Sequence, residues 1–252
     1  MAHRDQIVSY LDDLLDVGAY PDMTPNGLQV PGADTVELVV TGVSPGLELI
    51  EAAAERGAQL VLTHHGLLGD FLPDHVTPVL KRRLKALFDA DMSLAAYHLP
   101  LDAHAQVGNN ALVCSELGLE RAEPFGSYKG TTLGFVGRAQ SGIAFTELRE
   151  RCARAFGTEP FAWEYGPEVV HSVGVITGAA ASSLGEAVAA GLDAFLTGEP
   201  AEHVMLEARE AGIHFIAGSH YGTETFGVKR LGELLADRFG IRHEFVDVPN
   251  PV

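Results

Sequence analysis

Short apolar runs that are typical of buried strands alternate with helix-forming segments along the chain. The first run spans residues 36–43, the second 59–63 and the third 92–98, and helical sequence lies between them. Strands covered by helices on both faces of a parallel sheet have this continuous apolar character, without polar alternation. The alternation therefore predicts an α/β fold with a largely parallel sheet.

The second half of the chain resembles the first. Residues 40–64 are predicted as strand, helix and strand, and residues 176–198 repeat that order with similar sequence. We therefore expect two similar α/β domains, residues 1–126 and 127–252, that face each other across a cleft. The least regular stretch, residues 124–130, marks the boundary. The alternative is that the likeness is the generic one between any two strand–helix–strand units.

Composition argues against several classes of protein. The chain carries 34 acidic and 17 basic residues, a formal net charge of −17, which repels phosphate backbones and anionic lipids. We therefore expect neither nucleic acid nor membrane as a partner. Its two cysteines stand alone, and it contains no run of about 18 apolar residues. Acidic residues interrupt the N-terminal segment, so a signal peptide is not expected and a cytoplasmic location is predicted.

Five side chains that bind metals follow predicted strands. They are His64, His65 and Asp102 in the first domain and His220 and Glu224 in the second. Imidazole and carboxylate together suit Zn, Fe, Mn or Ni, and the lack of thiolates argues against a structural zinc knot. Because a catalytic zinc usually takes three protein ligands, five of them predict two divalent ions in one site, with Glu224 as the bridge. The alternative is that the paired histidines only cap strands.

Two further histidines flank Asp102 in the sequence. His98 ends the third strand and His104 follows two residues after Asp102. Either is a candidate for a proton donor or for a partner of a metal ligand. We favour His98 as the catalytic residue, because its position corresponds to that of His220 in the second half. A hydrogen-bonded histidine at a strand end is the alternative.

A serine motif offers a competing site. Residues 42–46 match G-x-S-x-G between a strand and a helix, the setting of a nucleophile elbow in serine hydrolases. Ser44 precedes Pro45, however, and is predicted as the N-cap of a helix that has proline at its first position. We therefore favour metal chemistry and keep a serine hydrolase as the alternative.

Short motifs spread over nearly the whole chain carry a family resemblance. They are Asn26-Gly27-Leu28-Gln29-Val30, Thr63-His64-His65-Gly66, Tyr97-His98-Leu99-Pro100-Leu101-Asp102-Ala103-His104, Gly108-Asn109-Asn110, Thr197-Gly198-Glu199, Gly218-Ser219-His220 and Asp247-Val248-Pro249-Asn250-Pro251. With these motifs the chain resembles the GTP cyclohydrolase I type 2 homologues, also described as Nif-three-like dinuclear metal-binding proteins. It resembles their short form, which has no inserted domain.

The resemblance implies a fold, an assembly and an activity. It implies two similar α/β domains with a dinuclear metal centre between them, bound by the same five ligands. It also implies a toroidal homohexamer whose metal sites face an inner cavity. The implied activity is a metal-dependent hydrolase that acts on a nucleotide-like substrate such as GTP, at C8 of the purine. The alternative is a non-enzymatic metal chaperone or regulatory module.

Overall fold

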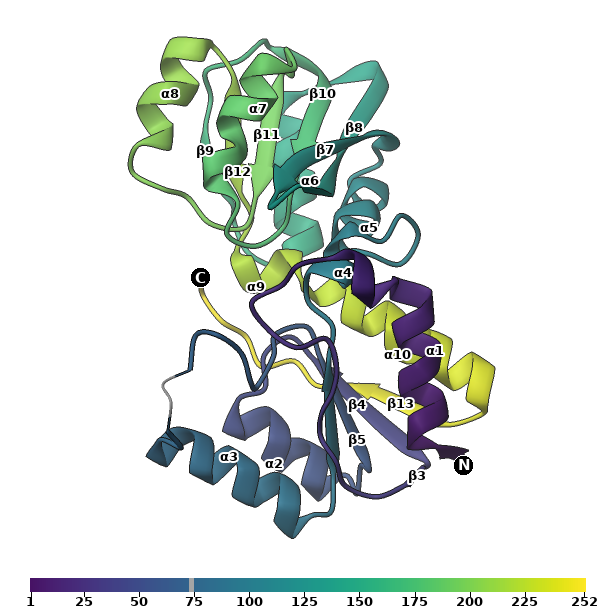
Figure 1. Ribbon diagram of the computed structural model, residues 1–252. Helices are drawn as coiled ribbons and strands as arrows, with labels where there is room; N and C mark the ends of the chain where they lie inside the picture. Colours follow the sequence, from purple (N-terminus) through teal and green to yellow (C-terminus); the bar gives the residue numbers. More distant parts are fainter. Residues whose placement is uncertain (73–74) are drawn as a thin grey trace. The chain divides into compact units, whose positions relative to one another are not determined.

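The computed structural model describes residues 1–72 and 75–252, which divide into two units (Figure 1). Unit 1 consists of Met1–Leu101 and Gly227–Val248, and unit 2 consists of Asp102–Phe226 and Pro249–Val252. Within the described residues, no helix combines the length and the apolar composition that crossing a bilayer requires.

Unit 1 is built on a mixed sheet with the strand order β13-β4-β5-β6-β2. The first four strands of that order are parallel and β2 is antiparallel to β6. Figure 1 draws α2 and α3 on one face of this sheet and α1 and α10 on the other. The elements are β1 (Ala2–His3), α1 (Arg4–Leu15), η1 (Val17–Ala19), β2 (Gly27–Val30), β3 (Thr35–Val36), β4 (Leu38–Gly42), α2 (Leu47–Glu55), β5 (Leu60–Thr63), α3 (Pro78–Asp89), β6 (Ser93–Ala96), α10 (Thr225–Phe239) and β13 (Arg242–Phe245).

Unit 2 contains a second mixed sheet, with the order β7-β8-β10-β11-β12-β9. Its strands β10, β11 and β12 are parallel, and β7, β8 and β9 each run antiparallel to their neighbours. The elements are the end of α4 (Leu99–Ala103), a helix that begins in unit 1, followed by α5 (Asn109–Glu116), β7 (Glu120–Tyr128), β8 (Thr131–Ala144), α6 (Phe145–Phe156), β9 (Phe161–Trp163), β10 (Val169–Val175), η2 (Ala181–Ser183), α7 (Leu184–Ala189), β11 (Ala194–Thr197), α8 (Val204–Ala211), β12 (His214–Ala217) and α9 (His220–Thr223).

Each unit contains the same parallel triplet of strands. In unit 1 the triplet is β4-β5-β6, connected by α2 and α3, and in unit 2 it is β10-β11-β12, connected by α7 and α8. All residues of β5, β6, β11 and β12 are buried, as continuous apolar strands between helices require. The predicted α/β class and the repeat are confirmed, although antiparallel strands make both sheets mixed.

The boundary between the units differs from the expected one. Residues 124–130 form part of a β-hairpin in which β7 pairs antiparallel with β8. Lys129 and Gly130 have φ of 48° and 87°, and two consecutive residues with positive φ match the right-handed twist of a two-residue hairpin. Residues 102–126 therefore belong to unit 2, whereas the sequence assigned them to the first domain. Unit 1 also includes the later segment from α10 to β13.

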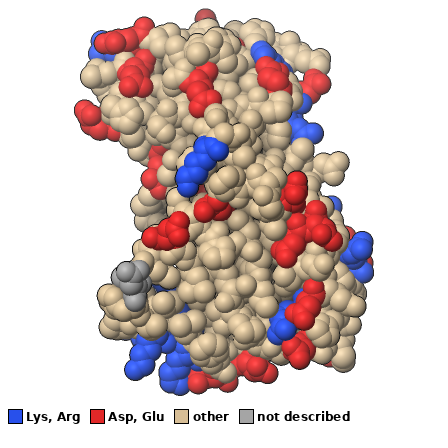
Figure 2. All heavy atoms as spheres, viewed as in Figure 1, with Lys and Arg blue, Asp and Glu red and all other residues tan. Residues whose placement is uncertain are grey.

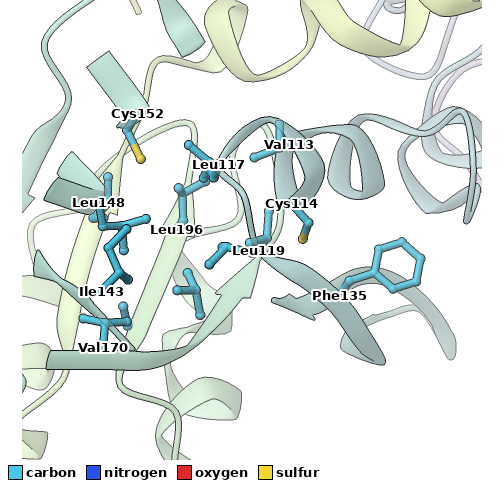
Figure 3. Close-up of a cluster of buried hydrophobic side chains, with 14 of the residues drawn as sticks. Val113, Cys114, Leu117, Leu119, Phe135, Ile143, Leu148, Cys152, Val170 and Leu196 are labelled. Atoms are coloured by element: carbon cyan, nitrogen blue, oxygen red, sulfur yellow. The ribbon is translucent and has the colours of Figure 1, made fainter. Parts of the chain in front are cut away.

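The two cysteines belong to a hydrophobic core of unit 2. Cys114 on α5 and Cys152 on α6 lie among buried side chains of β8 and β10, as Figure 3 shows. Burial raises the pKa of both thiols to about 12, so neither is present as a thiolate near neutral pH. The cysteines therefore act as small apolar core residues.

Acidic side chains dominate the charged surface. Figure 2 shows Asp and Glu spread over the visible face, with fewer Lys and Arg among them. This agrees with 34 acidic against 17 basic residues in the sequence.

Candidate metal-binding residues

The paired histidines follow β5 directly, at its carboxyl end. The backbone N–H groups of His64 and His65 both donate to the carbonyl of Val43, at 3.1 and 2.9 Å. The hydroxyl of Thr63 donates to the carbonyl of His65 at 2.8 Å. These three hydrogen bonds bend the chain at the end of the strand. The two rings consequently lie near one another, with centroids 5.0 Å apart.

The bend requires glycine at position 66, because any side chain there would collide with neighbouring residues. A Cβ atom there would lie 1.7 Å from Oγ1 of Thr24 and 2.8 Å from Nε2 of Gln29. Both neighbours are fixed: the Thr24 hydroxyl donates to the carbonyl of Leu68, and Oε1 of Gln29 accepts from two backbone N–H groups. The turn after the two histidines therefore requires glycine at this position.

Each of the paired rings contacts an oxygen through Nδ1. Nδ1 of His64 lies 3.0 Å from the carbonyl of Tyr97, and because a carbonyl only accepts, this nitrogen carries the proton. Nδ1 of His65 lies 2.7 Å from the hydroxyl of Ser44. Contacts of this kind orient metal-binding histidines and direct Nε2 toward the ion.

Ser44 is therefore a partner of His65 rather than a helix cap. Helix α2 begins at Leu47, with Gly46 as its N-cap, so the predicted capping role of Ser44 before an N1 proline is wrong. In a serine hydrolase, Nε2 of the histidine faces the nucleophile and a carboxylate holds Nδ1. Here the Ser44 hydroxyl itself occupies the Nδ1 side of the ring, which is the arrangement of an orienting partner.

His98 is held by a carboxylate. Its Nδ1 lies 2.8 Å from Oδ1 of Asp22, whose side chain is only 3% exposed. The other carboxylate oxygen accepts from Nδ2 of Asn26 at 3.1 Å and from the backbone N–H of Leu99 at 3.0 Å. Burial would raise the pKa of Asp22, but the hydrogen bonds from these groups and the charge of His98 lower it to about 2. Asp22 is therefore ionised at neutral pH.

The three rings of unit 1 form one group. The ring centroid of His98 lies 5.0 Å from that of His64 and 5.8 Å from that of His65. One ring nitrogen of each histidine lies within 4.8 Å of the others, which is close enough for a shared ion.

Asp102 lies in unit 2, at its start. Its Oδ1 accepts from Nδ2 of Asn109 at 2.8 Å and from the hydroxyl of Thr177 at 3.2 Å, and the residue is 6% exposed. Donors on one oxygen fix the orientation of a carboxylate that binds a metal through the other. His104 has a local role instead, because its Nδ1 accepts from the backbone N–H groups of Gln106 and the following residue.

His220 and Glu224 lie together in unit 2, at the two ends of α9. Nδ1 of His220 lies 2.5 Å from Oε1 of Glu199, and its Nε2 lies 3.2 Å from Oε2 of Glu224. Burial lowers the pKa of His220, but the Glu224 and Glu199 carboxylates outweigh it and raise the pKa to about 9. Near neutral pH the ring of the metal-free protein is therefore a cation, and a metal ion that binds a ring nitrogen would replace its proton.

Gly178 makes room for the buried carboxylate of Glu224. A Cβ atom at Gly178 would lie 2.4 Å from Oε1 of Glu224, and the φ of 70° also favours glycine. Glu224 is 2% exposed, and one of its oxygens lies within 4.8 Å of a carboxylate oxygen of Asp102. Unit 2 thus gathers two carboxylates and one imidazole.

The donor sets fit a divalent metal. Unit 1 brings together the predicted residues His64 and His65 with His98, and unit 2 brings together Asp102, His220 and Glu224. All four histidines have an oxygen at Nδ1, the arrangement found around metal-binding imidazoles. Their roles as ligands, and the number of ions, stay predictions.

Sequence reasoning missed most of the residues that hold these groups and gave Ser44 a different role. The missed residues are Asp22, Asn26, Asn109, Thr177 and Glu199. Asn26, Asn109 and Glu199 stand in the motifs that carry the family resemblance, whereas no signal in the sequence pointed to Asp22 or Thr177.

Comparison with known proteins identifies the family. A family model described as Duf34/NIF3 (NGG1p interacting factor 3) matches residues 2–251. The chain belongs to the NIF3 family. A GTP cyclohydrolase 1 type 2 homolog from Deinococcus radiodurans is 38% identical to this NIF3-family chain over 246 residues, which cover 98% of this chain and 93% of the relative. The predicted family resemblance is therefore confirmed.

Solved structures agree with this assignment to the NIF3 family. The protein ybgI, described as of unknown function, is 34% identical, with a TM-score of 0.94 and complete coverage (100%) of both chains. TTHA1606 from Thermus thermophilus is also 34% identical and covers 100% of both chains, with a TM-score of 0.89.

Proposed function

We propose that this NIF3-family protein binds two divalent metal ions and hydrolyses a nucleotide-like substrate. The proposed ligands are His64, His65, Asp102, His220 and Glu224. The observation that carries the proposal is the oxygen partner at Nδ1 of every candidate histidine, combined with two carboxylates that are 6% and 2% exposed. Structural histidines at strand ends do not require this repeated arrangement.

Two bound ions would supply an activated water and positive charge close to the carbon that this water attacks. The protein contributes the rest. Glu224, with Gly178 leaving space for its carboxylate, is the residue proposed to bridge the ions. Nε2 of His98, with Nδ1 on Asp22, is proposed to take up and release the proton that hydrolysis moves.

The proposed substrate class is a purine nucleotide. The relatives are described as GTP cyclohydrolase 1 type 2 homologs, which supports attack at C8 of the purine of GTP. A net charge of −17 repels a triphosphate, so this chain depends on bound cations to attract such a substrate.

The competing function is a metal chaperone or regulatory module. Deep burial of His64, which is 0% exposed, and of Glu224 also suits a site that holds ions without exposing them to a substrate. Such a protein needs the ligands but moves no proton, and this difference allows a test.

The test compares a ligand variant with a proton-transfer variant in metal-replete protein. Elemental analysis of the wild type should approach two transition-metal ions per chain, and a nucleotide screen read by mass should detect a hydrolysis product. Asp102→Ala should lower metal content and abolish turnover together. His98→Asn should keep the metal and lower turnover by about 10²–10⁴-fold, because it removes only the proton carrier.

Three outcomes would contradict the proposal. Saturation at one ion or fewer would exclude a dinuclear centre. Loss of metal in His98→Asn would make His98 a ligand rather than a proton carrier. Full metal content without product from any nucleotide would favour the chaperone.

A further inference from the structure

Two polar residues close a ring of hydrogen bonds around His98. The backbone N–H of His98 donates to Oδ1 of Asn26 at 2.8 Å, and Nδ2 of Asn26 donates to Oδ2 of Asp22 at 3.1 Å. Oδ1 of Asp22 in turn lies 2.8 Å from Nδ1 of His98. Both the main chain and the ring of His98 are therefore attached to one short segment.

This segment lies far from His98 in the sequence but not in the fold. Asp22 and Asn26 precede His98 by 76 and 72 residues and lie in the segment that leads into β2. Since β2 pairs with β6, the strand that leads into His98, sheet pairing brings the two segments together.

We propose that Asp22 and Asn26 position His98, and that they fix its tautomer. An ionised carboxylate only accepts, so Nδ1 of His98 carries the proton and Nε2 presents its lone pair to the group formed with His64 and His65. The catalytic consequence rests on the proposed function; the positioning itself does not. Asp22 is a positioning residue, because it acts through His98.

The partner of Nδ1 distinguishes the hydrogen bond of His98. Nδ1 of His64 faces a carbonyl and Nδ1 of His65 a hydroxyl, whereas Nδ1 of His98 faces a carboxylate whose side chain is 3% exposed. A hydrogen bond to an ionised carboxylate is stronger than one to a neutral oxygen. The ring of His98 is therefore fixed by a charge-assisted hydrogen bond.

A purely structural role for Asp22 is the competing explanation. Its Oδ2 also accepts the backbone N–H of Leu99, at the start of α4. In Asp22→Asn the single acceptor oxygen of the amide cannot serve His98 and Leu99 together. The two roles are separated by comparing His98 with His64 and His65, because a structural role would affect all three rings.

The experiment measures hydrogen–deuterium exchange at Cε1 of each histidine by mass spectrometry, in full-length protein without substrate. In Asp22→Asn the rate at His98 should rise several-fold, while the rates at His64 and His65 stay unchanged. Asn26→Ala should raise the exchange rate at His98 by a smaller factor. This variant replaces Asp22→Asn in the test if Asp22→Asn does not fold. Asp12→Asn is the matched control: Asp12 accepts from the Tyr97 hydroxyl at 2.7 Å and should leave His98 unchanged.

An unchanged His98 rate in Asp22→Asn and in Asn26→Ala would overturn the proposal. So would rates that rise together at all three rings, because they would indicate general loosening of the sheet. The exchange result is independent of any substrate, so it stands even if no nucleotide is hydrolysed. If a nucleotide is hydrolysed, Asp22→Asn should lower kcat for that nucleotide while KM and metal content stay near the wild-type values.

Discussion

Each candidate histidine owes its orientation to an oxygen from another part of the chain. Glu199 holds His220 and Ser44 holds His65, each from 21 residues away. Such contacts fix which ring nitrogen faces a metal and typically affect affinity about 10–100-fold. The residues around the ligands are thus as open to mutational test as the ligands themselves.

Ser44→Ala should weaken metal binding without abolishing it. The substitution removes the hydroxyl that lies 2.7 Å from Nδ1 of His65, so the ring loses its orienting partner but keeps its ligand atom. We expect metal affinity to fall by about 10–100-fold, measured by competition with a chelator. Complete loss of turnover at full metal occupancy would instead identify Ser44 as a nucleophile and reject the metal mechanism.

The stability of the metal-free protein should depend on His220. Its pKa in the folded protein, about 9, lies above the ordinary 6.5. The stabilisation is therefore fully present below pH 6.5 and is lost as pH rises through about 9. Denaturant unfolding of chelator-treated protein should show this decline, with a slope of at most about 1.4 kcal/mol per pH unit from this group.

His220→Asn provides the control for that measurement. Because asparagine does not titrate, the variant should lose this part of the pH dependence. An equal decline in both proteins would assign the effect to other groups.

The candidate ligands were easier to recognise in the sequence than the residues that hold them. His64 and His65 are recognisable because two histidines and a glycine directly follow an apolar strand. Asp22 has no local pattern, since its partner lies 76 residues away and only the pairing of β2 with β6 brings them together. The weak strand β2 was itself not predicted.

Secondary structure was most predictable where local pattern and tertiary burial agree. The apolar positions of α6 (Phe145–Phe156) fall on one face, so the sequence pattern by itself indicates this helix. The hairpin of β7 and β8 escaped prediction. Pro124 and the charged residues before it are unfavourable in a strand, and Lys129-Gly130 is a less recognisable turn than Asn-Gly.

Leu148→Ala should destabilise unit 2. Leu148 on α6 is 0% exposed in the core that contains Cys152, so truncation leaves a cavity. We expect the free energy of unfolding to fall by about 2–5 kcal/mol in denaturant titrations. Glu150→Ala on the exposed side of α6 should change it by about 0.5 kcal/mol or less. Similar losses in both variants would show that helix propensity, rather than core packing, is responsible.

At the scale of the whole molecule, the two units share a design but differ in continuity. Both contain a parallel triplet of buried strands, and candidate ligands follow the carboxyl ends of strands in each. Unit 2 is almost continuous in sequence, whereas unit 1 is completed by Gly227–Val248. The repeat could be recognised in the sequence because similar strands and turns recur. The addition of Gly227–Val248 to unit 1 could not, because the pairing of distant strands leaves no local signal.

The protein is predicted to assemble as a homohexamer. The prediction comes from the family resemblance alone, although closed symmetric assemblies are the usual form of soluble homo-oligomers. Light scattering should give the mass of a hexamer of 26.8 kDa chains. A monomer across working concentrations would contradict this.

The C-terminal segment completes unit 1, and this order affects how the chain can fold during synthesis on the ribosome. Strand β4 emerges early, but its neighbour β13 is translated only after every strand of unit 2. Until then the nascent sheet of unit 1 presents the apolar edge of β4 to any strand that can pair with it. Unit 2 can therefore fold before unit 1 is complete. The sheet whose strands are synthesised first is the last to gain all of its strands.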